Sequence, residues 1–248
     1  MDLRYETGRF LISGTLFLLA YFLHRRFSFR DFKQVGIAIY SNGVEDLSRI
    51  HEKIGQYPDF IHVDILDKTM SDSAEEIQLY RLETIKAFWP NCQVHSHIMS
   101  QYPSKWIDQI LPYSDIIYFH AECKENLYSL VDKIQQSGRK AGVALTMQTE
   151  PKDVIHLLKK SNAVLLLTVQ KPGKSGQHFD IDGLDRIKQV NSLPFRHRIQ
   201  LCIDGGVNEN IVGELDAENI VSGSSVLTNP DPKKQIMRLQ TVGRYESV

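Results

Sequence analysis

The chain has little of what a disulfide-stabilised or nucleic-acid-binding protein requires. Its three cysteines, Cys92, Cys123 and Cys202, are scattered and form no C-x-x-C pair, so neither a disulfide framework nor a structural zinc site is expected. A reducing compartment, the cytoplasm, is favoured. The formal net charge is -1 and no basic block stands out, which argues against a nucleic-acid partner.

Long hydrophobic runs are also scarce, apart from one near the N-terminus. This uncharged run extends from Phe10 to Leu23 and is shorter than the roughly 20 residues that a membrane span needs. No small-x-small cleavage site of a signal peptide follows it. We expect residues 1–34 to form an extension that packs on the domain or on a partner, or that associates with a membrane. A later translation start would need a non-Met codon, because no Met lies between Met1 and Met70.

From Val35 onward, short apolar runs that favour strands alternate with helical stretches. Eight such units are typical of a (β/α)8 TIM barrel, which needs about 250 residues, and residues 35–248 are predicted to form this single α/β domain. An open doubly wound sheet is the alternative, but the segment 41–43 lacks the G-x-G-x-x-G loop usual there. The predicted strands are residues 35–40, 60–65, 93–98, 116–119, 141–145, 164–169, 199–203 and 220–221. The predicted helices are residues 44–54, 77–88, 103–110, 126–136, 151–160, 181–190, 209–215 and 231–240.

Titratable side chains lie in or directly after four of these strands. His62 and Asp64 are two residues apart, so both point to the same face of the second strand. His97 follows on the third strand, His120 on the fourth and Asp204 on the seventh. Barrel active sites lie at the C-terminal ends of the strands, and imidazole and carboxylate groups bind divalent metals. His62, Asp64, His97 and Asp204 are therefore predicted to form a metal site.

Glycine-containing loops follow the last three strands. Backbone N–H groups in such loops commonly bind phosphate in barrel enzymes, because glycine lets the backbone approach an anion closely. The sequence therefore predicts a phosphate site at this end of the barrel. Its expected members are Gly173, Ser175, Gly176, Gly205, Gly206, Gly223 and Ser224.

A series of motifs resembles the ribulose-phosphate 3-epimerase family from about Val35 to about Leu239. The motifs are H-V-D-I-L-D (62–67), H-I-M-x-x-x-P-x-x-W (97–106), F-H-A-E (119–122), G-V-A-L (142–145), T-V-x-x-P-G-x-x-G-Q-x-F (168–179), I-D-G-G-V (203–207) and V-S-G-S-S (221–225). Their number and their order along the chain make the resemblance specific.

The resemblance implies a metal-dependent isomerase that interconverts D-ribulose 5-phosphate and D-xylulose 5-phosphate. One divalent ion would be held by His62, Asp64, His97 and Asp204, with zinc or iron favoured over cobalt or manganese. Asp64 and Asp204 would work on opposite faces of the sugar, one removing the C3 proton and the other returning a proton, through a metal-stabilised enediolate. His97 would also contact the substrate, and Met99 would shield the intermediate.

The chain departs from the family pattern around the sugar. Ala38 stands at a usual serine, Gly43 at a usual aspartate and His95 at another, while the segments 68–72 and 174–175 differ from the family loops. Two alternatives therefore stay open: the same chemistry on another ketose phosphate, or a non-catalytic sugar-phosphate-binding barrel. Association into a homo-oligomer is compatible with the sequence.

Overall fold

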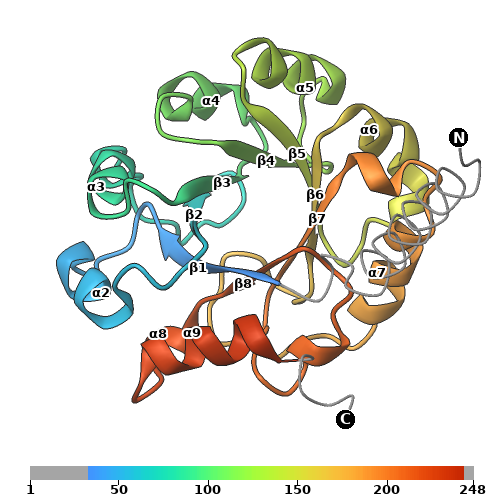
Figure 1. The fold of residues 1–248 in the computed structure, drawn as a ribbon. Helices are drawn as coiled ribbons and strands as arrows, with labels where there is room; N and C mark the ends of the chain where they lie inside the picture. The colour runs from blue at the N-terminus through green and yellow to red at the C-terminus, as the bar shows by residue number, and fades with distance from the viewer. Residues whose placement is uncertain (1–32, 243–248) are drawn as a thin grey trace, which may run out of the picture. The chain divides into compact units, whose positions relative to one another are not determined.

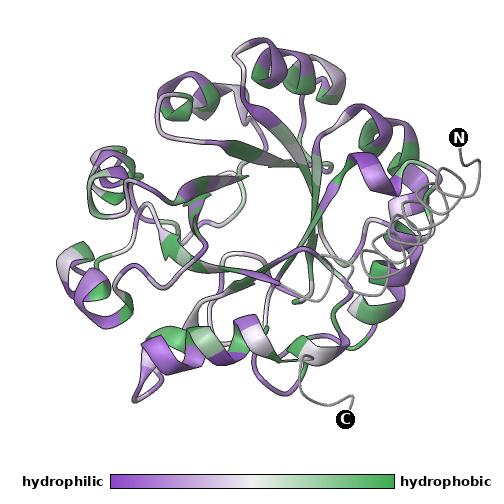
Figure 2. Ribbon diagram, viewed as in Figure 1, coloured by the Kyte–Doolittle hydropathy of each residue, from purple (hydrophilic) through white to green (hydrophobic). Residues whose placement is uncertain are grey.

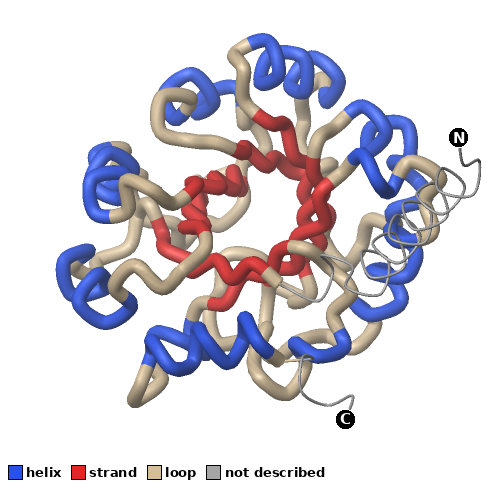
Figure 3. The backbone as a smooth tube through the Cα atoms, in the orientation of Figure 1, coloured by secondary structure: helices blue, strands red, loops and turns tan. Residues whose placement is uncertain are grey.

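The computed structural model describes residues 33–242. Its strands form a closed parallel barrel in which each strand pairs with the next and β8 pairs with β1 (Figures 1 and 3). This confirms the predicted (β/α)8 barrel and excludes the open sheet. The strands are β1 (Gln34–Tyr40), β2 (Phe60–Leu66), β3 (Gln93–Met99), β4 (Ile116–His120), β5 (Lys140–Leu145), β6 (Ala163–Leu167), β7 (Gln200–Asp204) and β8 (Asn219–Ser222).

Helices surround the strand ring (Figure 3). The α-helices are α2 (Leu47–Ile54), α3 (Tyr80–Phe88), α4 (Ser104–Ile110), α5 (Leu127–Gln136), α6 (Ile155–Lys160), α7 (Gly183–Asn191), α8 (Ser224–Leu227) and α9 (Pro232–Thr241). Short 3-10 turns lie at η2 (Pro151–Val154), η3 (Arg196–Arg198) and η4 (Val212–Glu214). Seven of the eight predicted helices appear, although α2 begins at Leu47 rather than at residue 44 and α3 at Tyr80 rather than at residue 77. The helix predicted over residues 209–215 is wrong, because only the 3-10 turn η4 lies there. The elements α8 and η3 were not predicted.

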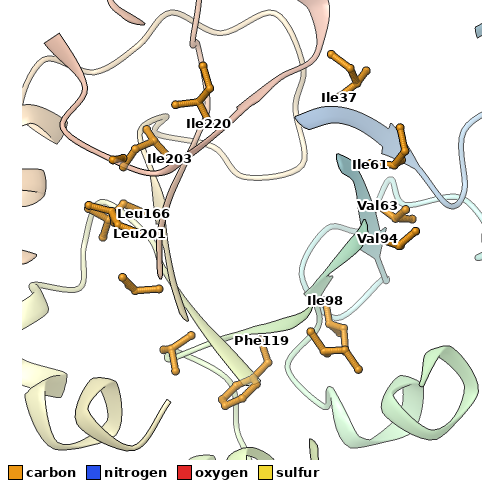
Figure 4. Close-up of a cluster of buried hydrophobic side chains, with 14 of the residues drawn as sticks. Ile37, Ile61, Val63, Val94, Ile98, Phe119, Leu166, Leu201, Ile203 and Ile220 are labelled. Carbon is orange, nitrogen blue, oxygen red and sulfur yellow. The ribbon is translucent and has the colours of Figure 1, made fainter. Parts of the chain in front are cut away.

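The main hydrophobic core lies between the strands and the helices. Alternate strand residues, among them Ile61, Ile98 and Leu166, face outward and are fully buried (Figure 4). The helices α2, α5, α7 and α9 each bury an apolar stripe and turn hydrophilic residues to the other face (Figure 2). This arrangement buries a helix face against each part of the sheet, as the barrel fold requires.

The other strand residues point into the barrel, where the lower part is filled by aromatic rings. The Phe60 ring stacks on His95 with centroids 4.1 Å apart, and Tyr118 is fully buried beside them. Two glycines make room for these rings. A Cβ at Gly36 would lie 2.1 Å from the Phe60 ring, and one at Gly142 would lie 2.2 Å from the Tyr118 ring.

The predictions for the N-terminal extension concern residues that lie largely outside the described part of the chain. The apolar run from Phe10 to Leu23 is one of these segments. The strand β1 begins at Gln34, and the boundary between residues 1–34 and 35–248 stays a prediction. Between residues 33 and 242, no helix combines the length and the apolar character that crossing a membrane would take. The three cysteines are free thiols.

Replacing Gly142 by alanine is expected to destabilise the barrel by roughly 1–3 kcal/mol, because the added methyl overlaps the buried Tyr118 ring. Urea unfolding followed by circular dichroism measures the change. Gly213→Ala is the matched control, since a Cβ there meets only Val242, at 3.5 Å. Equal free energies of unfolding for the two variants would contradict this account of the interior.

Candidate functional site

The predicted metal ligands come together at one end of the barrel because of the strand register. His62 and Asp64 alternate with outward-facing residues on β2, and both point inward as predicted. Asp64 pairs with His97 of β3 in the parallel ladder. Asp204 ends β7, which reaches β2 through β8 and β1 once the barrel is closed.

The four side chains form a compact group. The Nδ1 atom of His97 lies 3.0 Å from Asp64 Oδ1, and His62 Nε2 lies 3.4 Å from Asp64 Oδ1 and 3.9 Å from Asp204 Oδ2. One donor atom from each residue lies within 4.8 Å of the others. Two imidazoles and two carboxylates at this spacing can hold one divalent cation.

The surroundings of His62 also fit a bound cation. Its ring is fully buried, and among the described residues neither ring nitrogen has a hydrogen-bond partner. Buried polar atoms almost always have a partner, so a ring left in this state between two carboxylates is suited to metal ligation.

The two carboxylates differ in proton affinity. Burial raises the pKa of Asp64, but the facing rings of His62 and His97 outweigh this, and the pKa lies below its usual range. Burial raises the pKa of Asp204 to about 7, with His62 opposing the shift and the charge of Asp64 adding to it. Near neutral pH, therefore, Asp64 is a carboxylate whereas Asp204 holds a proton for part of the time.

The two histidines are affected in opposite directions. Burial lowers the pKa of His97 to about 4, so its ring is neutral and can act as a ligand. Burial also lowers the pKa of His62, but Asp64 and Asp204 outweigh it and the net shift is upward.

A cavity of about 480 Å³ opens above this group. Asp64, His97 and Asp204 lie in its wall, whereas His62 does not line it. The predicted phosphate-binding residues also line the cavity. They are Gly173, Ser175, Gly176, Gly205, Gly206, Gly223 and Ser224.

The loop after β7 needs its glycines for conformation and for space. Gly205 and Gly206 have φ angles of 115° and 69°, which residues with side chains rarely adopt. A Cβ at Gly206 would lie 2.1 Å from the backbone nitrogen of Phe179. The Thr168 hydroxyl donates to the Gly205 carbonyl at 2.6 Å, which fixes the loop against the end of β6.

Two side chains of functional interest were missed from the sequence. Tyr40 lines the cavity, and burial, with the charges of Asp64 and Asp204, raises the pKa of its phenol, which therefore stays protonated. Its position two residues after Ala38 on β1 was the available signal. Glu122 accepts a hydrogen bond from His120, which in turn contacts His97.

The departures from the family pattern fall in different places. Ala38, Lys174 and Ser175 line the cavity, whereas residues 68–72 do not. Asp67 anchors the start of that segment, accepting hydrogen bonds from Ser100 Oγ at 2.6 Å and Trp106 Nε1 at 2.9 Å. His95 lies below the metal group, stacked on Phe60.

Comparison with known proteins gives consistent matches. The sequence model of the ribulose-phosphate 3 epimerase family matches residues 34–227. The chain is 30% identical over 191 residues to a ribulose-phosphate 3-epimerase of Bacillus subtilis, covering 73% of this chain and 86% of that protein. With the ribulose-phosphate 3-epimerase of Escherichia coli it shares 28% identity over 193 residues, or 74% and 83% of the two chains.

Solved structures show the same fold at low sequence identity. 3-Hexulose-6-phosphate synthase from Salmonella typhimurium matches with a TM-score of 0.65 and 15% identity, covering 85% of this chain and 98% of that one. A crystal structure of KGPDC from Streptococcus mutans matches with a TM-score of 0.64 and 9% identity, covering 87% and 99%. These likenesses support the barrel alone. The family match, by contrast, spans most of the chain and includes every proposed ligand, so the chain is an epimerase-type enzyme that belongs to the ribulose-phosphate 3-epimerase family.

Proposed function

We propose that the protein is a metal-dependent epimerase that inverts C3 of a ketopentose phosphate, interconverting D-ribulose 5-phosphate and D-xylulose 5-phosphate. The observation that carries the proposal is the pair Asp64 and Asp204, two carboxylates with opposite pKa shifts in one cavity wall. Groups whose surroundings push their pKa values apart are the usual acid and base of an active site.

His62, Asp64, His97 and Asp204 would hold one divalent ion. The ligand set suits zinc, iron, cobalt or manganese, and we propose zinc or iron, with metal availability deciding between them. When bound, such an ion stabilises negative charge on the substrate oxygens beside the reacting carbon. A proton next to a carbonyl is otherwise too weakly acidic to be removed at neutral pH.

The two aspartates divide the proton transfer between them. In one direction Asp64 removes the proton from C3, and Asp204 delivers a proton to the other face of the carbon; in the reverse direction the roles exchange. Two groups are needed because a single base would return the proton to the face from which it came. Their positions on β2 and β7 place them on different strands around the cavity.

The glycine loops would bind the phosphate of the substrate. Gly173, Gly176, Gly205, Gly206 and Gly223 expose backbone at the cavity wall, where N–H groups can approach an anion closely. The hydroxyls of Ser175 and Ser224 and the ammonium of Lys174 lie in the same wall. His97, between this region and the metal group, would also contact the sugar.

A second candidate keeps the mechanism and changes the sugar. Ala38 offers no hydroxyl at the cavity wall, whereas Tyr40 offers a protonated phenol there. Such changes alter substrate preference more than reaction type. A panel of ketose phosphates distinguishes the two candidates, because a clear preference for ribulose 5-phosphate would remove the second.

A non-catalytic sugar-phosphate-binding barrel is disfavoured, because all four ligands and both acid–base groups are present. We further propose that the enzyme works in the cytoplasm, as its free thiols favour. Association with a membrane through the run from Phe10 to Leu23, and with a second copy of the chain, stay predictions.

The metal-loaded enzyme is expected to exchange the C3 proton of ribulose 5-phosphate with solvent deuterium, as followed by proton NMR. Asp204→Asn should lower kcat by about 10²–10⁴-fold while the fold is kept, because it removes one of the two proton carriers. Asp108→Asn, an exposed carboxylate paired with Lys133, is the matched control. Undiminished turnover in Asp204→Asn would exclude the two-aspartate mechanism.

Zinc affinity is expected to rise with pH through the range from 6 to 7. The pKa of Asp204 is raised to about 7 and the pKa of His62 is also raised, so a proton on either ligand competes with the metal, and each such proton should cost up to about tenfold in affinity per pH unit. Competition with a chromophoric chelator measures this. Asp204→Asn should make the profile less steep, because the proton on Asp204 no longer competes, and a wild-type profile without slope in this range would contradict the pKa assignment.

Gly206→Ala is expected to raise KM for the sugar phosphate by about tenfold or more. Its φ of 69° and the close backbone of Phe179 mean that a methyl group must move the loop. Gly138→Ala is the matched control: its φ is also positive, at 79°, but a Cβ there has no atom within 4 Å. A similar KM for both variants would show that the loop does not grip phosphate.

A further inference from the structure

A hydrogen-bonded row of side chains extends sideways from the metal group across the ends of β2, β3 and β4. His97 Nδ1 lies 3.0 Å from Asp64 Oδ1, and His97 Nε2 lies 3.0 Å from His120 Nε2. On its other side, His120 Nδ1 lies 3.2 Å from Glu122 Oε2. The two imidazole rings are stacked and buried, so their nitrogens have these partners in place of water.

Glu122, at the far end of the row, can only accept hydrogen bonds. Glu122 Oε1 accepts from the Thr146 backbone nitrogen at 3.0 Å, from the Thr146 hydroxyl at 2.8 Å and from the Thr149 hydroxyl. An ionised carboxylate only accepts, so the contact between Glu122 Oε2 and His120 requires a proton on His120 Nδ1.

That proton fixes the rest of the row. In a neutral imidazole the second nitrogen is an acceptor, and a divalent cation on the far side of His97 disfavours a positive charge on His120. With the cation bound, His120 Nε2 therefore accepts from an N–H at Nε2 of His97. The lone pair of His97 Nδ1 then faces Asp64 Oδ1 at 3.0 Å. Two buried acceptors at this distance repel one another unless a cation is bound to both.

We propose that Glu122 and His120 are positioning residues, which hold His97 as the Nε2–H tautomer and so present its Nδ1 lone pair to a divalent cation beside Asp64. Carboxylates behind a ligating histidine commonly fix its tautomer and raise its basicity; here a second histidine carries that effect between them. The inference rests on the metal site of the proposed function.

The loop that carries the Glu122 partners is itself held in place. Arg186 is largely buried, and its guanidinium donates to the Thr149 carbonyl at 2.5 Å and to the Leu167 carbonyl at 3.3 Å. Glu122 therefore faces His120 from a position defined by backbone contacts, as a positioning role requires.

Glu122→Gln tests which nitrogen donates and which accepts at each hydrogen bond of the row. The three donors at the Oε1 position would keep the amide oxygen there, so the new NH2 group would face His120 Nδ1. The row would then reverse, with His120 Nε2–H donating to His97 and the His97 proton moved to Nδ1, where it blocks ligation. Zinc affinity, measured by chelator competition, should fall by about 10–100-fold.

Glu125→Gln is the matched control, because this carboxylate lies in the same loop but accepts from Ser104 rather than from a histidine. Its zinc affinity should stay within about twofold of wild type. In the background of His120→Phe, which interrupts the row, Glu122→Gln should have no additional effect, since residues that act through one another are not additive.

Nitrogen-15 NMR of the histidine rings supplies a readout that does not depend on activity. In zinc-loaded wild type we expect the proton of His97 on Nε2 and that of His120 on Nδ1. This measurement, together with His120→Phe, decides the matter even where Glu122→Gln fails to fold.

The outcomes separate this inference from the function on which it rests. Equal zinc affinities of wild type and Glu122→Gln, or a proton on His97 Nδ1 in the zinc-loaded protein, would overturn the positioning role alone. A wild-type protein that binds no divalent metal would overturn the proposed function as well.

Discussion

The pairing of β8 with β1 is the constraint on which the site depends. Four register pairs, from Gln34 with Asn219 to Ile37 with Ser222, close the sheet on itself. Without this closure, β2 and β7 would belong to distant parts of an open sheet, and Asp204 would lie far from His62 and Asp64. Because the fold brings these strands around one axis, groups widely separated in the sequence lie together at one cavity.

Closure also sets the electrostatic cost of the site. The barrel interior buries Asp64 and two imidazoles, and half-buries Asp204, next to a cluster of apolar side chains such as Leu165 and Val221. Burying charges in such surroundings is unfavourable unless they are compensated. Three features compensate for this unfavourable free energy: a proton on Asp204, the contacts between Asp64 and the histidines, and a ligand set that suits a cation. The side chains proposed for catalysis therefore also affect the free energy of unfolding.

Much of this was predictable from the sequence. Strands that are buried on both faces appear in the sequence as short apolar runs, and these runs predicted the bounds of every strand to within a residue or two. The spacing of His62 and Asp64 predicted that both side chains lie on the same face of β2. Features that depend on register between strands were not predictable. His120 was recognised at a strand end, but its contact with His97 depends on how β3 and β4 align.

Short elements and loop partners escaped prediction for a related reason. The four residues of α8 are too few for a helical periodicity to be visible. Tyr40 itself has no feature in the sequence that distinguishes it from other strand residues, and Glu122 is one of two acidic residues in the loop between β4 and α5. Such roles are set by neighbours that the local sequence does not specify.

The aromatic filling of the lower barrel has a consequence for how the enzyme exchanges material with its surroundings. Phe60, His95 and Tyr118 fill the interior on one side of the metal group, and the cavity opens on the side that carries the glycine loops. A molecule bound in the cavity therefore leaves by the mouth through which it came. Product release and the entry of the next substrate have to follow one another, because both use this opening.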